Sequence, residues 1–134
     1  MGGKKGDYPP GTTWFQAGDD SPPVFTCANH QGRSVVLSTK QWDDHILLNH
    51  PEMARYQQYV EWCVVRPDVV TKDRRHPFRE CYYLHHVTPG KMTLVIRTVV
   101  DFDESVAQRF SVEGFVVTSH LMRHVNSKEA VLWP

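Results

Sequence analysis

The feature that most constrains the fold is a change in hydrophobic period near Pro67. Between residues 38 and 66, apolar residues recur every three to four positions, as they do on one face of a helix. Beyond Pro67 the chain instead contains segments rich in aromatic and β-branched residues, separated by turn-like or charged stretches. The strands predicted from these segments are 80–86, 92–100 and 114–121, with a shorter one at 69–70.

A strand hairpin is predicted before the helices. Residues 24–27 and 34–37 flank a turn-like segment, and the helix-start signal Ser38-Thr39 follows them. Because helices then precede strands without βαβ alternation, we expect an α+β domain. The hairpin and two helices should pack on one face of a mainly antiparallel sheet of about four strands.

Composition sets the domain count and excludes some partners. A chain of 134 residues, 40% of them hydrophobic, fits a single domain, which we place at residues 24–134. Residues 1–23 are rich in glycine and proline and show no apolar period, so we expect a flexible leader there. The formal net charge is zero, which indicates neither a polyanionic partner nor a membrane surface.

The cysteines and the apolar runs favour a protein of the cytoplasm. The three cysteines, Cys27, Cys63 and Cys81, are an odd number without the spacing of a metal site. No apolar signal segment follows the first residues, and no apolar run approaches the ~20 residues of a membrane helix. We therefore expect a reducing cytoplasm and no membrane partner.

Two histidines and a carboxylate surround one predicted break between helices. On a helical wheel His45 shares a sector with Trp42, so it should face inward or toward a cleft. Pro51 suits the first position of a new helix and disfavours helical geometry at His50, so the break is expected there, just before Glu52. Imidazole titrates nearest neutrality, so two such rings held near one point could exchange protons in one reaction.

These residues resemble a nuclease family. The residues that match most sharply are Trp42, His45, Ile46, His50, Pro51, Glu52 and Met53, with weaker matches at 67–68, 82–83 and 116–118. Over residues 24–122 the chain resembles the phage-type barnase/EndoU/colicin/RelE-like (BECR) nucleases, which are small toxin-like ribonuclease domains. The resemblance implies a helical N-terminal part on a four-stranded antiparallel sheet and metal-independent cleavage of RNA. It implies no cofactor, and an immunity or antitoxin protein as a possible partner.

Cleavage of that type requires a base for the ribose 2′-hydroxyl, an acid for the leaving 5′-oxygen and donors for the phosphate charge. We predict that His45 and His50 are the acid and the base, in an order that the sequence leaves open. Glu52 is placed to orient or charge one of them. With these assignments, both proton transfers would take place at the helix break.

Strand residues would complete the site. Arg97 is a lone cation in an apolar strand and is the predicted phosphate clamp, because guanidinium matches phosphate oxygens bidentately. Thr118 and His120 should project from the polar face of the last strand. The basic run 72–79 is the clear basic patch and should hold an RNA backbone. Its predicted substrate-binding residues are Lys72, Arg74, Arg75 and Arg79.

Each assignment has a structural alternative. His45 could be a core histidine, and His50 and Glu52 could be ordinary residues of a helix end. Arg97 could pair with an acid, the strand residues Thr118 and His120 could simply be exposed, and the basic run could be a solvated loop.

Two other classes of function therefore stay open. One is an inactive RNA- or protein-binding module of the same fold, because Ser119 stands where the family usually has an aromatic residue. The other is a His/Glu metal-dependent hydrolase, although histidines five apart lie about 140° from each other on a continuous helix.

Overall fold

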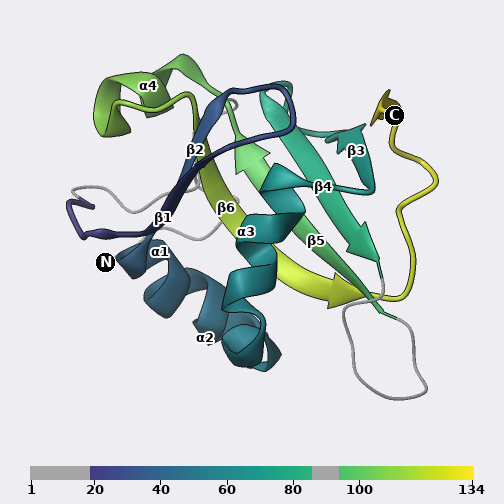
Figure 1. The fold of residues 1–134 in the computed structure, drawn as a ribbon, viewed down its shortest axis with the longest axis horizontal. Helices are drawn as coiled ribbons and strands as arrows, with labels where there is room; N and C mark the ends of the chain where they lie inside the picture. Colours follow the sequence, from purple (N-terminus) through teal and green to yellow (C-terminus); the bar gives the residue numbers. More distant parts are fainter. Residues whose placement is uncertain (1–18, 86–93) are drawn as a thin grey trace.

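A computed structural model gives the fold and describes residues 19–85 and 94–134. Within these residues, seven strands form one mixed sheet in the order β1-β2-β6-β5-β4-β3-β7 (Figure 1). The strands are β1 (Pro23–Ala28), β2 (Ser34–Ser38), β3 (Val69–Lys72), β4 (Arg79–His85), β5 (Val95–Asp101), β6 (Gly114–Met122) and β7 (Val131–Trp133). The α+β class is confirmed. The sheet is larger than the four strands expected, because the hairpin and the C-terminal strand both join it.

The hairpin joins the sheet through a short parallel contact. Strand β2 pairs with β6 at Val35–Gly114 and Val36–Phe115 only, whereas every other neighbouring pair of strands is antiparallel. Among the described strands, the edge of β6 beyond Phe115 therefore has no partner on that side. The first helical segment packs there, and Gln41 Nε2 donates to the Val117 carbonyl oxygen at 2.7 Å.

The first helical segment runs without a gap from Thr39 to Asn49. It comprises α1 (Thr39–Gln41), the π-helical turn η2 (Trp42–Ile46) and α2 (Leu47–Asn49). Ser38 caps it as predicted, since its Oγ accepts from the Gln41 amide at 3.0 Å. The backbone at His50 is not helical, with φ −137° and ψ 69°, which confirms the predicted break before Pro51.

The second helix differs from the prediction in one respect. It is divided into a 3-10 helix, η3 (Pro51–Arg55), and α3 (Gln57–Val65), because Tyr56 leaves helical geometry. The apolar residues that recur every three to four positions in this segment form a buried face, as their period predicts. Its members Met53, Tyr56, Val60, Cys63 and Val64 are buried and Tyr59 is partly buried. We call the side of the sheet that they cover the helix face, and Figure 1 shows α3 crossing it.

The helices do not all lie on one face, which corrects the predicted arrangement. Helix α4 (Glu104–Phe110), in a segment expected to be a charged connection, packs on the opposite side. There Val106 forms a separate cluster with Val36 and Phe115. The same side of the sheet carries Cys81, Tyr83, Val95, Val99 and Val117, and we call it the groove face.

The packed structure begins before the predicted boundary at residue 24. Asp19 is buried, and its carboxylate accepts from the hydroxyls of Ser21 at 2.6 Å and Ser38 at 2.5 Å. Burial alone would raise the pKa of Asp19, but these hydrogen bonds outweigh it and lower the pKa. The rest of the predicted leader, residues 1–18, lies outside the described residues, as do His86, Met92 and Thr93 of the predicted strands.

No helix in the described part of the chain is both long enough and apolar enough to span a membrane.

Candidate functional site

A groove of about 860 Å³ opens on the groove face of the sheet. Its lining comes from five parts of the chain: η2, the β3–β4 connection with the start of β4, β5, β6 and the segment before β7. The residues are His45, Asp73, Arg74, Arg75, His76, Arg79, Arg97, Val99, Val117, Thr118, Asn126 and Glu129. Six of the ten predicted site residues are among them: His45, Arg74, Arg75, Arg79, Arg97 and Thr118. The fold therefore brings the predicted helix histidine, strand arginine and strand threonine to one hollow.

The π-helical turn determines where His45 points. The Leu47 amide donates to the Trp42 carbonyl oxygen, which adds one residue to this turn. Trp42 and Ile46 are buried in the core, while His45 between them is half-buried and lines the groove. The side-chain hydrogen bond from Gln41 to β6 holds this turn against the strand edge. His45 thus lines the same groove as Thr118 of β6.

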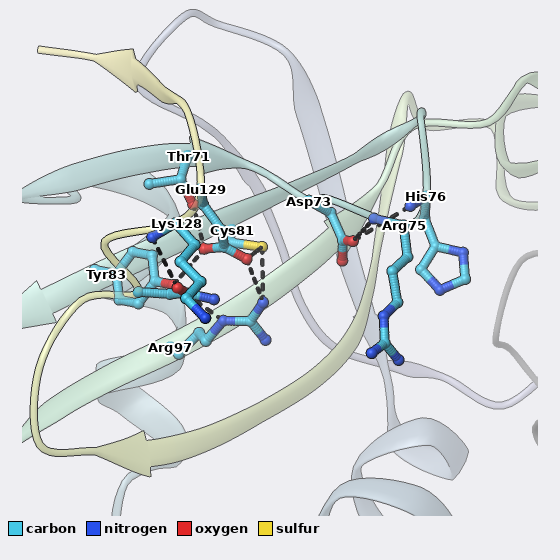
Figure 2. Close-up of polar contacts among 10 residues, drawn as sticks. Thr71, Asp73, Arg75, His76, Cys81, Tyr83, Arg97, Lys128 and Glu129 are labelled. Carbon is cyan, nitrogen blue, oxygen red and sulfur yellow. Dashed lines mark hydrogen bonds and ion pairs between the residues drawn. The ribbon is translucent and has the colours of Figure 1, made fainter.

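Arg97 reaches the groove through a network of buried polar groups (Figure 2). Its Nη2 donates to Glu129 Oε2 at 3.0 Å and to Cys81 Sγ at 3.1 Å, and its Nε donates to the Tyr83 hydroxyl at 3.1 Å. Nη1 makes no hydrogen bond to any residue in 19–85 or 94–134. The alternative that Arg97 pairs with an acid is therefore confirmed, while Nη1 has no hydrogen-bond partner among the described residues.

Glu129 is the centre of this network. It is 6% exposed, and its Oε1 accepts from the Tyr83 hydroxyl at 2.6 Å and the Thr71 hydroxyl at 2.7 Å. Burial alone would raise the pKa of Glu129, but these two hydrogen bonds and the charge of Arg97 lower it. Burial raises the pKa of the neighbouring Cys81 thiol to about 12, so this sulfur remains a thiol at neutral pH.

The basic run divides into free and engaged cations. Arg74 and Arg75 are exposed at the groove, on a loop held by Asp73 Oδ1, which accepts from the backbone amides of Arg75 and His76 (Figure 2). Arg79 is instead buried and pairs with Asp101 at 2.9 Å. Two of the four predicted substrate-binding residues thus keep an exposed charge at the groove.

The other basic residue of the predicted set lies elsewhere. Lys72 does not line the groove, and its Nζ donates to the Pro77 carbonyl oxygen.

The remaining predicted catalytic residues form a second cluster outside the groove lining. The rings of His50 and His120 are stacked, with centroids 5.0 Å apart and planes inclined at 24°. Glu52 Oε2 lies 3.7 Å from His50 Nδ1. His120 pairs in register with Arg97 across β5 and β6, so this cluster adjoins the network around Arg97. His50, Glu52 and His120 are thus together, but apart from His45 in the groove.

Sequence reasoning missed four polar residues of the groove. Asn126 and Glu129 come from a C-terminal segment in which no motif was visible, and Glu129 is 32 residues from Arg97 in the chain. Asp73 and His76 were seen only as part of the basic run, yet both line the groove. Burial and the charge of Arg79 lower the pKa of His76, which favours a neutral imidazole.

Two searches for known features gave no positive result. Within residues 19–85 and 94–134, no three histidine, cysteine or carboxylate side chains are grouped so that they could hold a metal ion. Comparison of the chain with protein-family models, curated proteins and solved structures gave no match. The nuclease resemblance therefore remains a prediction, and the geometry of the groove is what bears on function.

The ionised Glu129 network predicts a pH-dependent stability. The pKa of Glu129 is lowered below its ordinary 4.5 in the folded protein, so the stabilisation is fully present above about pH 4.5 and is lost as the pH falls through the folded value. At neutral pH, we expect Glu129→Gln to lower the free energy of unfolding by roughly 1.5–3 kcal/mol, because hydrogen bonds to a charged group are lost. Urea denaturation from pH 7 to pH 3 measures this.

The difference between the two proteins should shrink as the pH falls below about 4.5. A difference that stays constant over the whole range would contradict an ionised Glu129 in the folded protein.

Proposed function

We propose that this protein is a metal-independent endoribonuclease of the toxin-like type, with the groove as its active site. The observation that supports this is the convergence of His45, Arg97 and Thr118 on one hollow from a helix and two strands. A proton-transfer group, a guanidinium and a hydroxyl are the groups that phosphodiester cleavage by a neighbouring hydroxyl needs. The exposed cations Arg74 and Arg75 at the same groove suit an RNA backbone.

The acid and base are assigned from the groove lining. His76 favours the neutral form and so suits the base that takes the proton of the 2′-hydroxyl. The 2′-oxygen then bonds to phosphorus, the bond from phosphorus to the 5′-oxygen breaks, and His45 gives its proton to that oxygen. The products are a 2′,3′-cyclic phosphate and a free 5′-hydroxyl. This assignment replaces His50, which does not line the groove.

Arg97 and Thr118 stabilise the charge on phosphate in this mechanism. Nη1 of Arg97 donates to a non-bridging oxygen, while its other donors stay fixed by protein groups. The Thr118 hydroxyl is a second donor from the neighbouring strand. Donors that are oriented before substrate arrives need no reorganisation during the reaction, which makes their effect large.

The second candidate is an RNA-binding module without activity. The observation that favours it is the engagement of Arg97 by Glu129, Cys81 and Tyr83, which also suits a purely structural guanidinium. Assays of labelled RNA separate the classes. Cleavage that persists with a chelator supports the proposed nuclease, chelator-sensitive cleavage supports a metal-dependent hydrolase, and binding without cleavage supports the module.

We expect His45→Ala to reduce the rate of RNA cleavage by about 10²–10⁴-fold, the contribution of a general acid or base. Single-turnover cleavage of a short single-stranded RNA, with chelator present, measures the rate. His124→Ala is the matched control, because this histidine is exposed and does not line the groove. A wild-type rate in the His45 variant, or its failure to fold, would show that His45 is not the acid.

The second imidazole is identified by comparing two further variants in the same assay. We expect His76→Ala to lower the cleavage rate more than His50→Ala does, because only His76 lines the groove with His45. A larger loss of rate in His50→Ala than in His76→Ala would instead assign the second imidazole to the helix break. It would place the reaction at the His50–His120 pair.

Binding through Arg74 and Arg75 predicts a specific salt dependence. We expect each alanine substitution to reduce the slope of log affinity against log salt by about 0.7, the value for one phosphate contact on a single strand. A 2′-O-methyl oligonucleotide, which lacks the attacking hydroxyl, allows affinity to be measured by fluorescence anisotropy without cleavage. Arg66→Ala, an exposed arginine after α3, should leave the slope unchanged. Equal slopes in all variants would exclude the loop as the phosphate-binding element.

A further inference from the structure

We propose that Glu129 is a positioning residue, which fixes the Arg97 guanidinium so that Nη1 is presented to the groove. The effect of Glu129 on catalysis rests on the proposed function. Its structural part, the fixing of Arg97, stands on the contacts alone. The inference assigns to the C-terminal segment a role in the site that no sequence motif indicates.

The contacts of Glu129 use both carboxylate oxygens. Oε1 accepts from the hydroxyls of Thr71 and Tyr83, while Oε2 accepts from Arg97 Nη2 at 3.0 Å and from Cys81 Sγ at 3.6 Å. The donors come from β3, β4 and β5, so the carboxylate ties three neighbouring strands to the segment before β7. A carboxylate held by this many donors has a fixed orientation. Because Arg97 donates to this carboxylate, the orientation of its guanidinium is fixed as well.

The same contacts argue against Glu129 as the general base. Its side chain is 3% exposed, its pKa is lowered despite burial, and each oxygen already accepts two hydrogen bonds. A base must present a free lone pair to the substrate hydroxyl. Glu129 therefore acts through Arg97.

The guanidinium is restrained from a second side by Tyr83. This hydroxyl donates to Glu129 and accepts from Arg97 Nε, which closes a ring of three side chains (Figure 2). Interactions with Cys81, Tyr83 and Glu129 raise the pKa of Arg97 although burial opposes this, so the guanidinium stays charged. Nη1 is left for an external acceptor of negative charge.

Strand pairing brings Glu129 to this position. The Lys72 amide donates to the Ala130 carbonyl oxygen at 2.8 Å, and β7 pairs with β3 through Val70–Trp133 and Thr71–Val131. The turn before it is closed by the Glu129 amide, which donates to the Asn126 carbonyl oxygen at 3.2 Å. Glu129 therefore enters the network from the segment that leads into β7, the strand added at the sheet edge.

The structural part is tested without reference to activity. In ¹⁵N-labelled protein, the Nε–Hε signal of Arg97 can be assigned by its loss in Arg97→Lys. We expect this signal to be sharp and to show a high order parameter, and we expect its proton to exchange slowly with solvent. We expect Glu129→Gln to bring this signal to the intensity and order of an exposed arginine such as Arg74, because the amide cannot accept from Arg97 as the carboxylate does. An unchanged Arg97 signal in the variant would overturn the inference.

A matched control exists on the other face of the sheet. There Glu80 pairs with Arg33 at 2.8 Å and accepts from the Tyr82 hydroxyl at 2.9 Å, which repeats the combination of carboxylate, guanidinium and phenol. Glu80→Gln should leave the Arg97 signal as in the wild type. If Glu129→Gln does not fold, Tyr83→Phe serves instead, since it removes the acceptor of Arg97 Nε and should likewise mobilise Arg97.

The catalytic consequence is tested by a double-mutant cycle in the cleavage assay. We expect Glu129→Gln to lower kcat/KM roughly 10- to 100-fold, as for lost hydrogen bonds to a charged group, and to have no further effect once Arg97 is alanine. An additive loss in the double variant would mean that Glu129 acts independently of Arg97. If the wild-type protein cleaves no RNA, the proposed function fails, while the NMR comparison still decides the positioning role.

Discussion

The short parallel contact between β2 and β6 is the constraint on which the arrangement of the groove depends. Only two residue pairs join these strands, so no strand in the described part of the chain pairs with the rest of β6 on that side. A strand edge must have its backbone groups satisfied or covered. The first helical segment does both through Gln41, whose side chain donates to the Val117 carbonyl oxygen. Packing a helix against a strand edge, rather than flat on the sheet, gives it access to both faces.

This position of the helical segment explains how one element serves the core and the groove. Trp42 and Ile46 are buried on the helix face, whereas His45 lies with Thr118 in the groove on the opposite face. A regular helix laid flat on the sheet would place such close neighbours on the same side of it. The π-helical turn and the strand edge together separate them.

Local rules predicted the elements but not the contacts that assemble the site. Pro51 fixed the helix break, and the spacing of Met53, Val60 and Val64 identified the buried face of the second helix. The pairing of β2 with β6 is nonlocal, and β7 is a three-residue exposed edge strand without an alternating pattern, so neither had a sequence signal. The pairing of Glu129 with Arg97 could not be predicted for the same reason, because it is a nonlocal contact. His50 seemed equivalent to His45 because the break could bring both together, but the fold turned its ring toward His120 instead.

In the proposed function, different charges of the groove bind the substrate and stabilise the transition state. Arg79 is neutralised by Asp101 and Arg97 by Glu129, so these two cations contribute little long-range attraction to an RNA. In the proposed function, that attraction comes from Arg74 and Arg75, which are exposed on a loop held by Asp73. Because the chain has no net charge, the proposed function leaves nonspecific affinity for RNA to this small patch. Under the same proposal, the pairing of Arg97 would limit ground-state binding and keep Nη1 oriented, and an oriented donor favours the transition state over the bound substrate.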